Sequence, residues 1–300
     1  MTTTEVAPPP VRAGAAAPAV TVRGLVKRYG ATTVLDGLDL DVQRGECFAL
    51  LGPNGAGKTT TIELLEGVLR RDGGTVQVLG EDPARAGRGW RSRIGVVSQG
   101  EPAGQALSVR ETLDHFASYH ARPRPTADLL DAVGLTGQAG VRVRGLSGGQ
   151  RRRLAVALGV QGRPELVFLD EPTTGMDPVA RRQFWSLIRE LGAAGTTVLL
   201  TTHYLDEAAE LADRVGVVSG GRLVEVAAPD QLGIPLRRVA TVSWTEDGTR
   251  RRVHTETPAA VLRDLLAASP HGEVPGLTVT RPSLEDVYLS LVGATPAGDL

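Results

Sequence analysis

Residues 47–71, CFALLGPNGAGKTTTIELLEGVLRR, decide the fold. Five apolar residues lead directly into a glycine-rich loop, and apolar residues then recur at helical spacing at Ile62, Leu65 and Leu69. Strand, glycine-rich turn and helix in this order are typical of a phosphate-binding loop, because the backbone N–H groups at the start of the helix face the bound anion. The sequence therefore predicts an α/β nucleotide-binding core.

The loop itself matches the pattern G-x-x-x-x-G-K-[ST]. Its backbone N–H groups would surround the phosphates, the Lys58 ammonium would reach the β and γ oxygens, and the Thr59 hydroxyl would ligate Mg²⁺. We expect a nucleoside triphosphate to contact the whole loop, namely Gly52, Pro53, Asn54, Gly55, Ala56, Gly57, Lys58, Thr59 and Thr60.

The use of lysine supports this interpretation. Two of the 33 basic residues are lysines, Lys27 and Lys58, so the other 31 are arginines. Arginine is a wide planar fork, whereas lysine is a compact charge on a thin stem. Lysine is thus retained in the middle of the glycine loop, where only the thinner side chain can pass between two phosphates.

Apolar runs elsewhere predict a mostly parallel sheet. Four further runs lie at 94–98, 166–170, 196–202 and 215–219. Because these runs are continuous rather than alternating, we expect helices on both faces of the sheet. The strand-like segments 20–30 and 32–46 indicate an N-terminal antiparallel β subdomain, and a long helical stretch at roughly 108–160 indicates a helical insertion.

The chain divides into three predicted segments. Residues 1–18 are rich in Ala, Pro and Thr with few apolar anchors, which favours a disordered tail. Residues 19–235 form the nucleotide-binding domain, with the helical subdomain at about 100–160. Residues 236–300 predict a small α+β appendage, because a hairpin signal at 247–248 is followed by helical and strand-like segments.

Acidic residues follow the apolar run 166–170 in the stretch LVFLDEPTTGMDP. Asp170 ends this strand at the carboxyl edge of the sheet, where ligands of open α/β sheets bind. Asp170 fits a metal-holding acid, and Glu171 fits the general base that activates the attacking water.

Two polar residues follow other strands at the same edge. His203 comes after the run 196–202, and we expect it to contact the γ-phosphate. Gln99 follows the run 94–98, and its amide could meet both the metal and the water. The predicted catalytic residues are thus Glu171, His203 and Gln99, and the predicted metal ligands are Thr59, Gln99 and Asp170.

A second anion-binding feature is the stretch LSGGQ at 146–150, directly before an arginine run and a helical apolar run. A serine and two glycines ahead of a helix present N–H groups and the positive end of the helix dipole to an oxyanion. The predicted ligand-binding residues here are Ser147, Gly148, Gly149 and Gln150. We expect the arginines at 151–153 to form a solvated or acid-paired helix face.

Together, the phosphate loop, LSGGQ, LDEPT and the histidine after a strand resemble the ATP-binding-cassette (ABC) family over about residues 20–230. The stretches LGPNGAGKTT, TTGMDP, THYLDEA and PSLEDVYLSLVG are further similar to the ATPase subunits of daunorubicin-resistance-type exporters. In that subgroup a separate ATPase chain pairs with a separate membrane chain.

The resemblance implies an ATPase that uses ATP and Mg²⁺ to drive export through an integral-membrane permease, from the cytoplasmic side, peripheral on the inner face of the cell membrane. It implies that Tyr29 stacks on adenine, that Gln99 links the metal site to the membrane-facing helical insertion, and that Asp177 lies in a loop crossing a dimer interface. Two copies, or one copy and a related ATPase, would pack head to tail, so that each LSGGQ caps the γ-phosphate bound on its neighbour.

The composition of the chain limits the partners and the compartment that fit it. A net charge of −1 argues against nucleic acid as the main partner, and the single Cys47 cannot form an internal disulfide, which fits a reducing compartment. No stretch approaches the ~18 apolar residues of a membrane span.

Two other functions are compatible with a phosphate loop. A soluble ABC-type ATPase acting on ribosomes or nucleic acid would generally carry two cassettes or a coiled-coil insertion. This chain has one phosphate-binding loop and no sustained heptad repeat of apolar residues. A small-molecule kinase would leave LSGGQ as a mere turn. The appendage either supports dimer or partner contacts, as in similar relatives, or is a packed cap.

Overall fold

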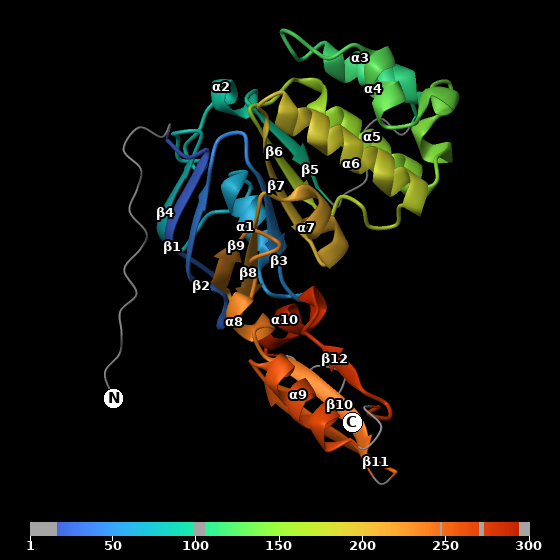
Figure 1. Cartoon of the computed structure of the whole chain (residues 1–300). Helices are drawn as coiled ribbons and strands as arrows, with labels where there is room; N and C mark the ends of the chain where they lie inside the picture. Colours follow the sequence, from blue (N-terminus) through green and yellow to red (C-terminus); the bar gives the residue numbers. More distant parts are fainter. Residues whose placement is uncertain (1–16, 99–105, 247, 270–272, 294–300) are drawn as a thin grey trace.

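Six strands form the central sheet, in the order β5-β6-β7-β3-β8-β9. In this computed structural model, which describes residues 17–98, 106–246, 248–269 and 273–293, the sheet lies at the centre of the molecule (Figure 1). The strands are β3 (Cys47–Leu51), β5 (Ile94–Val97), β6 (Leu166–Asp170), β7 (Thr197–Thr202), β8 (Arg214–Ser219) and β9 (Arg222–Ala227). All pair in parallel except β9, which is antiparallel to β8. The predicted parallel sheet is confirmed.

The two faces of the sheet contribute to separate hydrophobic cores, because side chains alternate along a strand. In β3, Ala49 and Leu51 belong to one core, whereas Phe48 and Leu50 belong to the other. Every residue of β3 and β6 is buried, as the continuous apolar runs require. The strand that leads into the glycine loop is therefore fixed from both sides.

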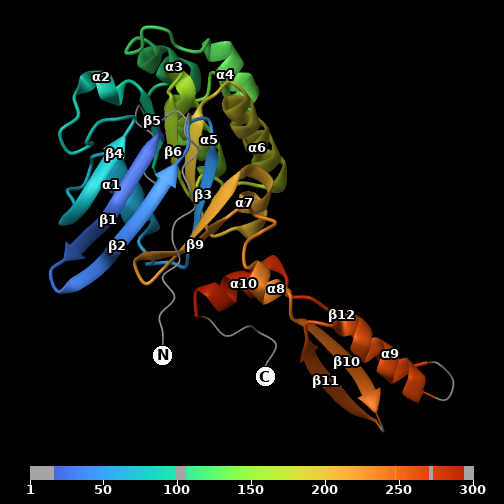
Figure 2. The same cartoon turned by 60° about the vertical axis from the view of Figure 1, so that its left-hand side comes forward.

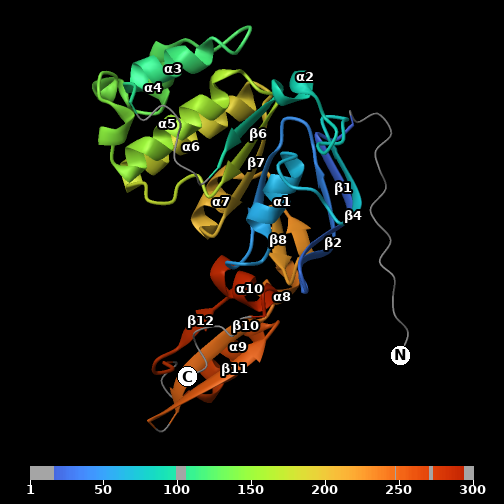
Figure 3. The ribbon, with the colours of Figure 1, turned by 180° about the vertical axis from the view of Figure 1, so that it is seen from behind.

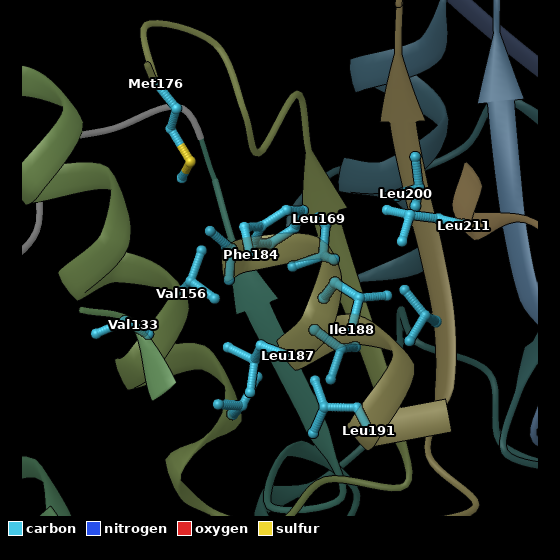
Figure 4. Packing of buried hydrophobic residues seen from close by; sticks show 14 of the residues in the cluster. Val133, Val156, Leu169, Met176, Phe184, Leu187, Ile188, Leu191, Leu200 and Leu211 are labelled. Atoms are coloured by element: carbon cyan, nitrogen blue, oxygen red, sulfur yellow. The ribbon is translucent and has the colours of Figure 1, made fainter. Parts of the chain in front are cut away.

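Helices cover one face of the sheet, and a helix and a second sheet cover the other. The first face carries α5 (Gly148–Gln161), α6 (Pro178–Ala193) and α7 (Leu205–Leu211). Figure 4 shows Phe184 of α6 beside Leu169 of β6, with Leu187 and Leu191 farther along α6 in the same core. The other face carries α1 (Lys58–Leu65) and the antiparallel sheet β2-β1-β4, made of Thr32–Val42, Val20–Tyr29 and Gly73–Val78, with the short α2 (Arg88–Arg91) beside it. The predicted N-terminal antiparallel subdomain is confirmed.

The predicted helical stretch 108–160 is broken into pieces. It contains α3 (Val109–Ala117), α4 (Thr126–Ala132), the short 3-10 turns Thr136–Gln138 and Val143–Gly145, and α5. Pro123 and Pro125 separate α3 from α4, because proline disfavours a helical conformation at the residue before it and cannot continue a helix. These pieces form one end of the molecule, seen from the opposite side in Figure 3.

The C-terminal appendage lies at the opposite end of the molecule (Figure 2). A short helix, α8 (Ile234–Arg237), leads into the sheet β11-β10-β12, made of Thr249–Thr255, Ala240–Glu246 and Thr278–Thr280, with α9 (Pro258–Ala268) against β10. The last helix, α10 (Leu284–Leu291), returns to the core, where Val287 is fully buried. No helix in the described ranges has the length and apolar character needed to cross a membrane.

Candidate active site

The glycine loop connects β3 to α1 and is packed too tightly for side chains at two positions. Gly57 caps α1 with φ 101°, and a Cβ there would lie 2.7 Å from Leu35 Cδ2. A Cβ on Gly52 would lie 2.7 Å from the Val218 carbonyl oxygen. Glycine is therefore required at both positions, since a left-handed φ and a close contact each exclude larger residues. The loop backbone lines an open pocket of about 510 Å³.

Lys58 begins α1 and is held inside this loop. Its side chain is 5% exposed, and Nζ donates hydrogen bonds to the carbonyl oxygens of Gly52 (2.7 Å) and Pro53 (3.1 Å). Glu171 Oε1 lies 3.9 Å from Nζ. Burial lowers the pKa of the Lys58 ammonium, and the negative charges of Glu171 and Asp170 partly oppose that shift. The lysine predicted to reach the phosphates thus lines the pocket in a fixed position.

Asp170 ends β6 and contacts Thr59, which lines the pocket. Its carboxylate accepts hydrogen bonds from Thr59 Oγ1, at 3.0 and 3.3 Å, and from Thr201 Oγ1 at 2.5 Å. A hydroxyl beside a buried carboxylate is a donor set of the oxygen type that Mg²⁺ prefers, with further positions left for water and phosphate. Thr59 and Asp170 therefore fit as magnesium ligands. The third predicted ligand, Gln99, lies outside the described residues.

Glu171 has an unusual backbone conformation. Its φ is +47°, in the left-handed region that costs a non-glycine residue roughly 1–2 kcal/mol. Two hydrogen bonds hold this conformation, because the Glu171 N–H donates to the Thr201 carbonyl oxygen (3.1 Å) and to Thr201 Oγ1 (3.0 Å). Glu171 Oε1 then lies 3.4 Å from His203 Nδ1. The structure thus brings together the predicted general base, the predicted phosphate contact and the loop lysine.

Thr201 is a residue of the site that the sequence reasoning missed. It pairs with Asp170 in the parallel register of β6 and β7, so its hydroxyl faces the carboxylate and its carbonyl faces the Glu171 N–H. The feature of the sequence that could have identified Thr201 is its position two residues before His203, at the carboxyl end of the neighbouring strand.

LSGGQ lies outside the pocket. Ser147 caps α5 in a reciprocal capping box, in which its hydroxyl accepts from the Gln150 N–H (3.3 Å) and its N–H donates to Gln150 Oε1 (2.9 Å). Ser147 and Gly148 are exposed, and a Cβ built on Gly148 would meet no described atom within 4 Å. The start of this helix is therefore open to solvent.

Two other predicted ligand residues also lie outside the pocket lining. Asp177 caps α6 and accepts hydrogen bonds from the N–H groups of Val179 and Ala180, both at 2.9 Å, which lower the pKa of its carboxyl. Tyr29 ends β1 at the tip of the β1–β2 hairpin and is 49% exposed, with Lys27 Nζ 5.3 Å from its ring centroid.

Arg152 and Arg153 differ from the expectation of a solvated or acid-paired face for the arginines at 151–153. Arg152 donates to the backbone carbonyl oxygens of Ser98, Asp170 and Pro172. Arg153 donates to those of Val133 and Gly134. A run of like charges resembles a surface stripe in sequence, but here the guanidinium donors satisfy carbonyls that strand ends and turns leave unpaired. Arg152 ties α5 to the end of β6.

A parallel sheet with a glycine loop, an acid pair and a histidine at one edge, together with a helical insertion ending in a serine-glycine cap, defines the class of ATP-binding cassettes. Residues 35–174 match the family described as ABC transporter. The chain belongs to the ABC transporter family, as an ATP-binding subunit of an exporter with transport-coupled ATPase activity.

Two relatives align over nearly the whole chain. One is the Nod factor export ATP-binding protein I of Ralstonia nicotianae, 39% identical over 92% of this chain and 94% of the relative. The other is the daunorubicin/doxorubicin resistance ATP-binding protein DrrA of Streptomyces peucetius, 38% identical over 94% of each chain. A solved ATP-binding subunit of an ABC transporter superposes with a TM-score of 0.65 at 27% identity, covering 71% of this chain and 91% of that chain.

Proposed function

We propose that this subunit works as a head-to-tail pair around ATP, with a second copy or a related ATPase, and powers an integral-membrane permease. Each loop pocket would hold ATP, and each LSGGQ would cap the γ-phosphate on the neighbouring subunit. The pair would lie in the cytoplasm against the inner face of the membrane, and the permease would select the cargo. Nucleic acid is not a proposed partner.

One observation carries this proposal, namely the contrast between the two anion-binding features. Lys58 in the pocket and Asp170 next to Thr59 are hydrogen-bonded to groups of their own chain, whereas Ser147 and Gly148 present an open helix start to solvent. Helix N-termini attract anions through their N–H groups and dipole. Because the open helix start lies outside the pocket lining, it is available to a phosphate held by another subunit.

Each predicted residue then has a role. Lys58 binds the β and γ oxygens, the loop backbone surrounds the phosphates, and Tyr29 stacks on adenine. Thr59, Asp170 and Gln99 would hold Mg²⁺, which neutralises phosphate charge when it is bound. Asp177 would meet the opposing subunit.

Hydrolysis is assigned to Glu171 and His203. Glu171 accepts the proton of the attacking water. Its backbone has a left-handed conformation, and its carboxylate lies near His203 and Lys58. His203 orients Glu171 and contacts the γ-phosphate.

The dependence of ATP turnover on protein concentration tests the pairing. We expect turnover per subunit to rise with concentration, and Ser147→Arg to abolish that rise while ATP affinity at low concentration stays within about twofold. Ser108→Arg is the matched control, since Ser108 also caps a helix through a capping box, and either change should cost about 1 kcal/mol of helix stability. Full turnover by dilute monomer, or equal loss in both variants, would contradict the pairing.

A further inference from the structure

A groove of about 510 Å³ lies in the C-terminal appendage, apart from the ATP pocket. Strands β10, β11 and β12 form one wall, and α10, through Asp286, Val287 and Ser290, forms the other. Its volume falls within the roughly 300–1,000 Å³ typical of small-molecule sites. Figure 2 shows α10 between this small sheet and the core. None of the residues assigned to ATP lines this groove.

Basic side chains gather on the groove wall through strand alternation. Arg250, Arg252 and His254 occupy alternate positions of β11 and line the groove together. Arg251, the intervening residue, lies on the other face with the buried Val242 and pairs with Glu246 at 3.3 Å. The charged and titratable side chains that β11 contributes to the groove are therefore all basic.

The opposite end of the groove adds a third guanidinium and one carboxylate. Arg281 follows β12, and Asp286 stands in the first turn of α10. The Asp286 carboxylate already accepts hydrogen bonds from the Ser283 N–H (2.8 Å) and hydroxyl (2.7 Å). Arg250 and Arg281 thus line the groove with one locally occupied carboxylate, so the lining carries a net positive charge in a concave site.

The hydroxyl groups of β10 complete the lining. Thr241 and Ser243 face the groove opposite His254 and Arg252, and Thr241 Oγ1 lies 3.0 Å from His254 Nδ1. Guanidinium forks with neighbouring hydroxyls match the oxygens of a phosphate better than those of an isolated carboxylate, because several donors can converge on one tetrahedral group.

We propose that this groove is a binding site for a phosphate-bearing anion. The ligand is recognised by its phosphate, whether this belongs to a soluble phosphorylated molecule or to a lipid headgroup. Because α10 is anchored in the ATPase core by Val287, a phosphate held between Arg250 on the sheet and Arg281 beside α10 would fasten the appendage to the core.

Pyrophosphate titration of the full chain tests the site, with imidazole NMR resonances as the readout. His254 reports on the groove, and His203, near Glu171, reports separately on the ATP pocket. We expect the His254 resonance, assigned with His254→Gln, to shift saturably below 1 mM, an order of magnitude expected for a few charge-assisted hydrogen bonds.

Charge-matched variants locate the binding. Arg250→Gln and Arg281→Gln should each weaken pyrophosphate binding about tenfold, whereas Arg251→Gln, which removes the same charge from the other face, should change it less than twofold. An Arg251→Gln effect as large as that of Arg250→Gln would overturn the proposal, and so would citrate binding as tightly as pyrophosphate.

Vesicles distinguish the two sources of phosphate. Sedimentation with phosphatidylglycerol vesicles that Arg250→Gln abolishes and Arg251→Gln preserves would support the site and assign it to lipid. Saturable pyrophosphate binding without such sedimentation would support it and assign it to a soluble ligand. The absence of both a saturable His254 shift and Arg250-dependent sedimentation would overturn it.

Discussion

The loop pocket and the start of α5 both offer backbone N–H groups to an anion, but they are built differently. Lys58 is buried and donates to two carbonyls of its own loop, and Asp170 accepts from two threonines. Ser147 and Gly148 are exposed, with only a capping box formed. A buried charge needs partners within its own chain, whereas N–H groups at an open helix start can remain hydrated until a ligand arrives.

Loss of the general base gives the largest effect expected for this comparison. Glu171→Gln should lower ATP turnover about 10²–10⁴-fold, because the amide cannot accept the proton of water, while ATP affinity stays within about threefold. Steady-state phosphate release and nucleotide titration measure the two quantities. Glu190→Gln, on the exposed side of α6, is the control. Undiminished turnover in Glu171→Gln would mean that a residue other than Glu171 is the general base.

Removal of the loop ammonium should weaken ATP binding itself. Lys58→Ala deletes a charge-assisted contact to phosphate, so we expect about a 100-fold loss of ATP affinity in calorimetry. Lys27→Ala removes the other lysine of the chain and should change affinity less than about threefold. Equal effects of the two substitutions would show that the pocket attracts ATP by net charge and has no fitted position for lysine.

The pH dependence of stability tests the environment of Glu66, an acid at the end of α1. Glu66 follows α1, and burial, with a smaller contribution from Asp170, raises the pKa of its carboxyl to about 8. Above about pH 4.5 the unfolded chain releases this proton, whereas the folded protein keeps it up to about pH 8. The free energy of unfolding therefore falls as the pH rises from about 4.5 toward 8.

Glu66→Gln should consequently raise the free energy of unfolding by about 3 kcal/mol at pH 8 and change it little at pH 5, measured by urea denaturation. Glu63→Gln, within α1, serves as the comparison and should give a much smaller gain, because the Glu63 charge is the smallest of the three causes that raise the Glu66 pKa. A gain for Glu66→Gln of the same size at both pH values would contradict the raised pKa.

Arg152 joins the two compared regions, because it starts in α5 and donates to carbonyls at the ends of β5 and β6. Arg152→Gln should lower the free energy of unfolding by about 2 kcal/mol, since several carbonyl acceptors lose their donor. The exposed Arg144→Gln should change it by less than about 0.5 kcal/mol. An unchanged denaturation midpoint for Arg152→Gln would show that this link adds nothing to stability.

Much of the fold could be predicted from local patterns. Continuous apolar runs indicate buried parallel strands, and the chemistry of the glycine loop is contained within nine consecutive residues. The pairing of Asp170 with Thr201 depends instead on strand register, and the carbonyl contacts of Arg152 depend on how α5 lies across the sheet. Such contacts join segments distant in sequence, and no local periodicity encodes them.

The return of α10 to the core changes how the end of the chain should be understood. Val287 packs so closely on Gly233 that a Cβ there would lie 2.1 Å from Val287 Cγ1. The sheet β10–β12 with α9 thus leaves the core after the buried Leu232 and is followed by α10, which the buried Val287 returns to the core. A stop codon at 236 would remove α10 and uncover apolar core. Excision of 238–282, with a short linker in its place, would keep α10 on the core. Transplanting this module between relatives therefore requires two junctions.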